Sequence, residues 1–307
     1  MSMSSPSLAQ HLIWRIEAAA FDLLTAGVRL LPVDAASWLG GAALRLLGPF
    51  SGSHRTAQRN LTLAFPEMDE AERRRILRAQ WDNLGRYFIE LTMMERLTLD
   101  SGRVEIEGAG EARLREIARE AAPTVFFSGH FSNMEIMAST ILGMGVPCLI
   151  TGRRLNNPYV DERLMQCRRR YGAVMFAAKG SDGTREMLQA LNRGQSIALM
   201  NDQKNNMGVA APFFGHLCHT ASGPTKMALR TSGVLQPMSV QRLSGARFRV
   251  IVHDPIVLDK TGDRAADVEA GVRRINAFIE ARVRERPQEW FWVHKRWANA
   301  AYAALDA

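Results

Sequence analysis

The sequence predicts an α/β fold with a mainly parallel central sheet, flanked by helices and preceded by an N-terminal helical region. Short apolar segments that suit strands alternate with longer segments that suit helices between residues 104 and 202. Polar residues follow several of these strands directly. In open sheets of this kind, functional sites lie beyond the carboxyl ends of the strands. We therefore expect a site at that edge of the sheet.

Composition limits the classes of function. The chain has 307 residues, enough for one large α/β domain with an added region or for two smaller domains. Its three cysteines form no CxxC pair, which favours a reducing compartment. A net charge of +8 favours an acidic partner, such as nucleic acid, anionic lipid or an acidic protein. No helix-turn-helix or RNP motif occurs, so we do not expect nucleic-acid binding.

The first part of the chain predicts two helices, over residues 11–31 and 35–50, separated at Pro32. We assign residues 1–50 to a helical, membrane-associating segment and residues 51–307 to the main domain. The opening residues lack the basic and apolar regions of a secretory signal.

Charged residues interrupt both predicted N-terminal helices, so neither contains the ~20 apolar residues of a spanning helix. Two arrangements fit this pattern. The helices either lie in a membrane interface or pack against the body of the protein. Trp14 and Trp38 slightly favour the interface, where indole rings concentrate.

Two helices and a strand are predicted next. A basic helix covers residues 55–63, and a long helix follows Asp69, which suits the N-cap position. A strand over residues 104–108 and a charged helix ending near residue 122 come after it.

The segment VFFSGHFSNMEIM, residues 125–137, combines a strand with a candidate site. Its apolar half predicts a short buried strand, and the following residues predict a helix whose first turn is capped by Ser132 or Asn133. His130 lies between the strand and the helix, and Glu135 lies within the predicted helix.

Helix geometry limits how His130 and Glu135 can meet. Five helical positions would turn the two side chains about 140° apart. They meet if His130 lies on the turn after the strand and Glu135 in the first turns of the helix. The carboxylate would then hold one imidazole nitrogen while the other faces a substrate. The alternative is a capping histidine and a surface glutamate.

The alternation continues with strands over residues 146–152, 173–178 and 196–202 and helices over 157–171 and 183–192. Polar residues follow three of the buried strands: His130, Arg153 with Arg154, and Asp202. Unrelated surface residues would not collect at one sheet edge, so this convergence favours a real site.

Residues 203–240 predict a long irregular segment, with a helix starting near Pro224. Phe213 and Phe214 either line a groove for a fatty chain or belong to the core. His216 to His219 resembles part of a metal site, but structural zinc needs four ligands and no second cluster exists, so no metal is expected. A strand over residues 247–257, an amphipathic helix and a tryptophan-rich tail complete the chain.

Six short motifs then resemble those of one family: RNLTLAFPE, GHFSNMEIM, GRRLNNP, NDQ, PFFG and PQEWFWVHKRW. They occur in the order seen in bacterial lipid A late acyltransferases, the lauroyl/myristoyl acyltransferase family of the lysophospholipid acyltransferase-like superfamily. The resemblance covers nearly the whole chain from about Leu12. Six motifs in order are far more specific than one.

The resemblance implies a glycerolipid acyltransferase-like fold and acyl transfer from an acyl-carrier-protein thioester to a hydroxyl of a membrane glycolipid, the lipid A precursor. It implies an inner-membrane surface, on the cytoplasmic face, as the place of reaction. No cofactor is expected besides the acyl thioester as co-substrate.

The same resemblance assigns the site. His130 would be the general base, with Glu135 fixing its tautomer and stabilising the imidazolium. Asp202 matches a functional aspartate of the family, and its role is either catalytic or structural. Arg153, or amide groups near Gly129 and the helix start, would stabilise the oxyanion. The expected substrate-binding residues are Asn133, Arg153, Arg154, Arg168, Arg169, Arg170, Phe214, Gly215 and Arg296. Arg168 to Arg170 would hold phosphates or form a solvated helix end.

Other functions stay open at this point. The acceptor could be another glycolipid or an aminolipid, and the donor acyl-CoA. The fold could also serve as a non-catalytic lipid-binding or carrier-binding subunit, or as a thioesterase that uses water.

Overall fold

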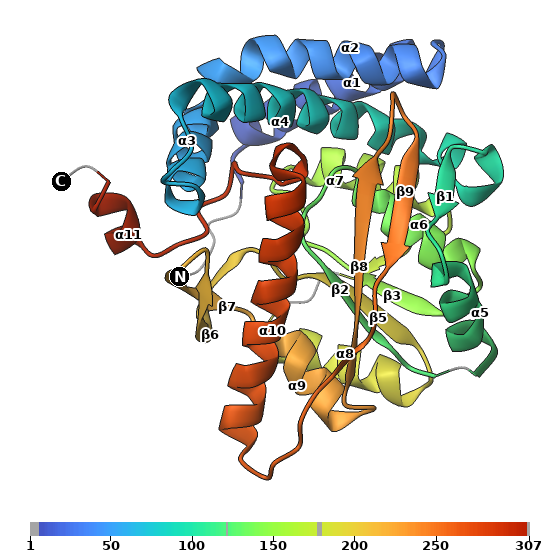
Figure 1. The fold of residues 1–307 in the computed structure, drawn as a ribbon. Coiled ribbons are helices and arrows are strands. Elements are labelled where there is room, and N and C mark those ends of the chain that lie inside the picture. The colour runs from blue at the N-terminus through green and yellow to red at the C-terminus, as the bar shows by residue number, and fades with distance from the viewer. Residues whose placement is uncertain (1–5, 121, 177–179, 306–307) are drawn as a thin grey trace.

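The computed structural model contains a central sheet with the strand order β1-β9-β8-β2-β5-β3-β4 and with β10 beside β8 (Figure 1). It describes residues 6–120, 122–176 and 180–305. The strands are β1 (Val104–Ile106), β2 (Val125–Ser128), β3 (Cys148–Thr151), β4 (Met175–Phe176), β5 (Ser196–Met200), β8 (Val234–Arg242), β9 (Phe248–Val252) and β10 (Ile256–Val257). All neighbours pair in parallel except β8 with β9 and β8 with β10. The predicted α/β class with a mainly parallel sheet is confirmed.

Helices cover both faces of this sheet. Figure 1 shows α10 (Arg264–Glu285) across the front face and α6 (Glu135–Gly143) and α7 (Pro158–Arg169) behind the sheet. The other helices of the main body are α5 (Gly110–Glu120), α8 (Gly180–Asn192), α9 (Gly223–Arg230) and α11 (Asn299–Ala303). Of the predicted strand over residues 173–178, β4 is described, and Ala177 and Ala178 lie outside the described residues.

The helices α1 (Leu8–Arg29), α2 (Val33–Leu47), α3 (Gly52–Ala64) and α4 (Glu70–Glu90) lie together at the end of the sheet where β2 and β8 finish (Figure 1). As predicted, the first two are separated around Pro32, and Asp69 caps α4 by accepting from the amide of Glu72 at 2.8 Å. The short 3₁₀ helices are η1 (Gly48–Phe50), η2 (Leu91–Arg96), η3 (Leu99–Ser101) and η4 (Pro287–Glu289).

Helices α2 and α4 cross at two glycines. A Cβ atom on Gly85 would lie 2.1 Å from the carbonyl oxygen of Gly40, so only glycine permits this approach. The crossing packs α2 tightly onto the body. The second of the two expected arrangements, packing against the body, is therefore seen for α2.

The outward face of α1 and α2 is apolar. Its exposed large side chains are Leu8, Leu12, Ile13, Ile16, Leu23, Leu24, Trp38, Leu39, Leu46 and Leu47. Among the described residues, no helix combines the length and the apolar character that crossing a membrane requires.

The irregular segment expected over residues 203–240 is wrong for its first half and again from Val234, where β8 begins. Strands β6 (Lys204–Phe213) and β7 (His216–Thr220) form a hairpin, followed by α9 near Pro224 as predicted. Both turn residues have positive φ, 50° at Phe214 and 74° at Gly215, as a two-residue hairpin turn needs. Phenylalanine disfavours that conformation. Two contacts hold Phe214 in it: its amide donates a hydrogen bond to Glu280, and the guanidinium of Arg284 lies 4.4 Å from the centroid of its ring.

The tryptophan-rich tail is part of the core rather than an appendage. Trp290, Trp292 and Trp297 are all buried, and Phe213 packs against Trp290 and Trp297. A bridge between Trp290 and Phe131, three residues beyond β2, brings the tail to the carboxyl edge of the sheet.

Candidate active site

His130 and Asp202 meet at the carboxyl edge of the sheet. Each lies two residues beyond its strand, β2 or β5, and these strands are parallel neighbours. The imidazole Nδ1 is 2.6 Å from Oδ1 of Asp202, and the amide of His130 donates to Oδ2 at 2.8 Å. The predicted convergence of these two residues is confirmed.

The C-terminal tail clamps this turn. Trp290 Nε1 donates to Oδ2 of Asp202 at 2.6 Å, and the amide of Phe291 donates to the carbonyl of His130 at 3.2 Å. The amide of Ser132 donates to the carbonyl of Glu289 at 2.8 Å. The turn is also strained, because Ser132 has a φ of 45°. These contacts fix the position of the imidazole.

Opposing effects set the protonation of the pair. Burial would raise the pKa of Asp202, but the charge of His130 and hydrogen bonds from His130 and Trp290 lower it to about 2. Burial would lower the pKa of His130, but the charge and hydrogen bond of Asp202 outweigh it, so this pKa is raised. An ionised carboxylate only accepts hydrogen bonds, so Nδ1 carries the proton and Nε2 of the neutral ring keeps its lone pair.

Glu135 does not orient the imidazole, which corrects the expected pairing with His130. Its buried carboxylate accepts three hydrogen bonds from Arg168, the shortest at 2.6 Å, and further ones from Tyr87 and Tyr171. Glu135 sits in the first turn of α6, as expected, but the end of α7 brings Arg168 to it. Asp202 takes the orienting position instead.

Arg168 therefore does not present its guanidinium to substrate phosphates. Its side chain is 13% exposed, and its pairing with Glu135 raises its pKa despite the opposing effect of burial. Arg169 is exposed and pairs with Glu162 at 2.6 Å. Arg170 is exposed at the end of α7. Arg169 and Arg170 therefore form part of a solvated helix end, the alternative to phosphate binding.

The other expected substrate-binding residues divide into exposed and buried ones. Arg153 and Arg154 are exposed, and Arg154 lies 3.4 Å from Asp161. Asn133 is fully buried, donates to Glu90 at 2.9 Å and accepts from the amide of Glu135 at 3.2 Å. Asn133 thus supports the start of α6 from the position before its N-cap, which is Met134 rather than the expected Ser132 or Asn133, and does not face solvent.

The contacts of Phe214, Gly215 and Arg296 are with the β6–β7 hairpin and its neighbours. Phe214 and Gly215 form the hairpin turn described above. Arg296 is 1% exposed and donates to the carbonyls of Gln203 and His219, to Thr220 and to Asn276. Arg296 therefore ties the tail to the hairpin and is corrected from a substrate contact to a buried structural cation.

Sequence reasoning missed five residues around the site: Tyr87, Tyr171, Trp290, Phe291 and His294. The ring of His294 has its centroid 6.4 Å from that of His130, and burial with the charge of His130 lowers its pKa. Three of the five lie in the PQEWFWVHKRW motif, which pointed to the site as a whole. The tyrosines carried no comparable signal, because α4 and α7 bring them in from far along the chain.

Three of the amides near Gly129, among those expected to stabilise an oxyanion, are already occupied. His130, Phe131 and Ser132 donate their N–H groups to Asp202, Gly129 and Glu289. Arg153, the other expected donor, is exposed.

The described residues contain no group of three His, Cys, Asp or Glu side chains placed to hold a metal. In the HLCH stretch, His216 and His219 bond to the carbonyls of Leu63 and Gly208. The site offers proton-transfer chemistry: an imidazole, 18% exposed, whose Nδ1 is held by a buried carboxylate and whose Nε2 is left to accept a proton.

Comparison with known proteins identifies relatives along most of the chain. The model for the family described as bacterial lipid A biosynthesis acyltransferase matches residues 8–299. The chain is similar to the lipid A biosynthesis lauroyltransferase of Escherichia coli (26% identity, covering 84% of this chain and 82% of the relative). It is also similar to two other lipid A biosynthesis enzymes of that organism. The palmitoleoyltransferase is 22% identical, covering 87% of this chain and 86% of the relative. The myristoyltransferase is 24% identical, covering 84% of this chain and 85% of the relative.

A solved structure matches with a TM-score of 0.39 and 13% identity, over 84% of this chain and 98% of the other. It is a 1-acyl-sn-glycerophosphate acyltransferase from Thermotoga maritima.

Proposed function

Because the chain belongs to the family of bacterial lipid A biosynthesis acyltransferases, we propose that it transfers a fatty acyl chain from an acyl-carrier-protein thioester to a hydroxyl group of a lipid A precursor. The observation that carries this proposal is the contact between His130 and the buried Asp202 at the carboxyl edge of the sheet. We propose a lauroyl or myristoyl chain as the group transferred, after the names of two relatives.

The chemistry follows from the protonation of the pair. Nε2 of neutral His130 removes the proton of the acceptor hydroxyl as its oxygen attacks the thioester carbonyl carbon. The tetrahedral intermediate collapses, the carbon–sulfur bond breaks, and the imidazolium returns the proton to the leaving thiolate. Asp202 stabilises the transient imidazolium, as the carboxylate does in triad enzymes, and no covalent acyl-enzyme is needed.

The surface of the protein supports a lipid acceptor. The apolar outward face of α1 and α2 gives the protein a surface with which to lie on a bilayer, and we propose the cytoplasmic face of the inner membrane as that bilayer. The net charge of +8 would attract both an acidic carrier protein and anionic lipid.

A purified-enzyme assay tests the proposal. Lauroyl or myristoyl carrier-protein thioester is mixed with a lipid A precursor in detergent, and products are identified by mass spectrometry. We expect an acylated lipid from the wild type and a loss on the order of 10³-fold in His130→Ala. His219→Ala is the matched control, because His219 is exposed on β7 and its ring bonds to the backbone carbonyl of Gly208.

Three results would each contradict a part of the proposal. Full activity of His130→Ala would remove the catalytic base. Release of free fatty acid without an acceptor would indicate a thioesterase. Turnover with acyl-CoA but not with the carrier thioester, or with a different glycolipid or an aminolipid, would change the donor or the acceptor.

A further inference from the structure

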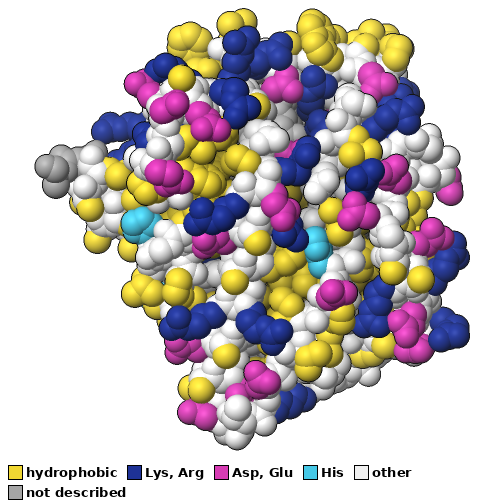
Figure 2. All heavy atoms as spheres, in the orientation of Figure 1, with side chains coloured by type: hydrophobic (Ala, Val, Ile, Leu, Met, Phe, Trp, Pro, Cys, Tyr) yellow, Lys and Arg dark blue, Asp and Glu magenta, His cyan; other side chains and the backbone are white. Residues whose placement is uncertain are grey.

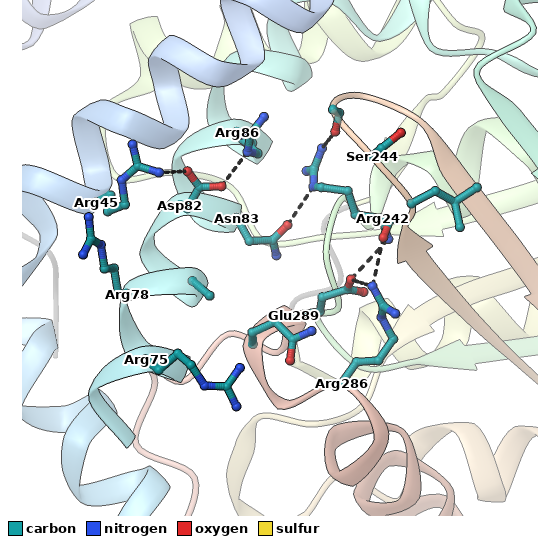
Figure 3. Close-up of a pocket in the computed structure, with 14 residues that line it drawn as sticks. Arg45, Arg75, Arg78, Asp82, Asn83, Arg86, Arg242, Ser244, Arg286 and Glu289 are labelled. Carbon is teal, nitrogen blue, oxygen red and sulfur yellow. Dashed lines mark hydrogen bonds and ion pairs between the residues drawn. The ribbon is translucent and has the colours of Figure 1, made fainter. Parts of the chain in front are cut away.

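A basic pocket lies between α4 and the β8–β9 hairpin, outside the catalytic turn. It has a volume of about 530 Å³ and is lined by six arginines and two carboxylates, a surplus of four positive charges. Its arginines are Arg45, Arg75, Arg78, Arg86, Arg242 and Arg286. Figure 3 shows arginines of α2 and α4 on one wall and Arg242 and Arg286 on the other. Such a surplus favours a multiply charged anion.

The positive charge is only partly neutralised within the protein. Asp82 pairs with Arg45 and Arg86, and Glu289 pairs with Arg286. Arg75 pairs with Glu72 and Arg242 pairs with Glu90, two carboxylates just outside the lining. Counting these two carboxylates as well, the pocket keeps a surplus of two positive charges. Arg78 makes no hydrogen bond or ion pair with the residues that the structure describes.

A buried donor without a partner gives independent evidence for a ligand. Asn83 lines the pocket and is 6% exposed. Its Oδ1 accepts from Nε of Arg242 at 3.1 Å, but its Nδ2 has no partner (Figure 3). A buried unsatisfied donor costs about 1–3 kcal/mol, so a ligand oxygen that reaches Nδ2 would recover this cost. The Nε atom of Arg286, also in the lining, is unsatisfied too.

The position of the pocket indicates where the anion comes from. Arg45 directly precedes Leu46 and Leu47, which are 69% and 60% exposed on α2. Leu243, at the tip of the hairpin, lines the pocket and is 44% exposed. Figure 2 shows basic side chains gathered beside apolar ones over α2 and α4. If these leucines enter the apolar layer of a membrane, the guanidinium groups lie at the depth of the headgroups.

We propose that this pocket binds the phosphate group of a membrane lipid headgroup. A phosphomonoester offers several acceptor oxygens, which suit guanidinium forks and the free amide of Asn83. An acidic protein would present its carboxylates on a broad surface, and such a surface would reach the buried amide of Asn83 less well than a phosphate group would. The site is separate from His130, although Asn83 and Glu289 both contact Ser132, two residues beyond it.

Vesicle binding by the His130→Ala protein tests the proposal independently of catalysis. Phosphatidylcholine vesicles carry either phosphatidic acid, a phosphomonoester, or phosphatidylglycerol, a diester, at matched surface potential. We expect tighter binding to phosphatidic acid. This preference should weaken about tenfold or more in Arg75→Gln/Arg78→Gln and in the isosteric Asn83→Asp.

Arg74→Gln/Arg115→Gln is the matched control, since it removes two exposed arginines outside the pocket. Equal weakening in the control, or no preference for the phosphomonoester in the parent protein, would overturn the proposal. Two further results would reassign the pocket. Thermal stabilisation by inorganic phosphate without vesicle preference would point to free phosphate. A raised KM for the carrier thioester with unchanged vesicle binding, measured with His130 intact, would point to a protein partner.

Discussion

Nδ1 of His130 lies 2.6 Å from Oδ1 of Asp202, although 72 positions separate the two residues in the chain. The pair is formed because β2 and β5 are parallel neighbours that end together. Since Trp290 and the amide of His130 take the other carboxylate oxygen, the hydrogen bonds leave Asp202 little freedom to turn away. This relationship makes Asp202 the residue whose removal most directly tests the mechanism.

Asp202→Asn should lower the maximal rate and shift its pH dependence. Without the carboxylate, the ring loses the partner that fixes its tautomer, and we expect kcat to fall on the order of 10³- to 10⁴-fold. The wild-type rate should rise with pH through a pKa above the usual value of about 6.5, because Asp202 raises the pKa of His130. In the variant, burial acts alone, so the acidic limb should move to lower pH. An unmoved limb in the pH–rate profile would contradict this role.

The same pair predicts how stability depends on pH. The lowered pKa of Asp202, about 2, contributes stability that is present above its unfolded value near 4 and is lost as pH falls through about 2. The raised pKa of His130 contributes stability that is full below about 6.5 and is lost as pH rises through its folded value. The free energy of unfolding of the wild type should therefore exceed that of Asp202→Asn most between about pH 4 and 6.5. Urea unfolding across this range measures the difference, and a constant difference would refute the linkage.

The buried ion pair between Glu135 and Arg168 predicts coupled effects on stability. Glu135→Gln or Arg168→Met leaves one charge buried without its partner, and each should cost about 3–5 kcal/mol. The double variant should lose much less than the sum, because no uncompensated charge remains. Urea unfolding of the four proteins gives the coupling energy, and additive losses would show that the pair is not coupled.

The role of Glu135 in catalysis can be separated from its role in stability. Because Asp202 is the partner of Nδ1, Glu135→Gln should leave the acidic limb of the pH–rate profile in place even where its rate is low. A shift like that of Asp202→Asn would instead restore Glu135 as the partner of His130.

The sequence was sufficient for the fold class and for two of the site residues. His130 and Asp202 could be found because each directly follows an apolar strand, and strand ends in a parallel sheet share one edge. Their pairing could not be found, because β3 and β4 lie between β2 and β5 in the chain while β5 lies directly beside β2 in the sheet. Glu135 was chosen because it is near His130 in sequence, but α7 brings a stronger partner to it.

Long-range packing explains the other differences. The β6–β7 hairpin carries a phenylalanine where a turn signal would place asparagine or glycine, and Glu280 on α10 compensates. Arg296 stood in a family motif and suggested a substrate contact, but acceptors from three other segments surround it. These acceptors become neighbours only in the folded chain.

The apolar face of α1 should carry most of the attachment to membranes. Leu12 and Leu23 are 62% and 77% exposed, and each would bury its side chain in the interface, a gain of about 1.5–3 kcal/mol if burial is complete. We expect Leu12→Glu/Leu23→Glu to weaken binding to phosphatidylcholine vesicles about a hundredfold or more in a flotation assay. Val174→Glu/Leu217→Glu is the control, because Val174 and Leu217 are 71% and 64% exposed but lie outside α1 and α2. Because these vesicles are neutral, attraction between the charged protein and a charged surface does not contribute to the binding. Equal losses of vesicle binding in both variants would mean that α1 does not carry most of the attachment.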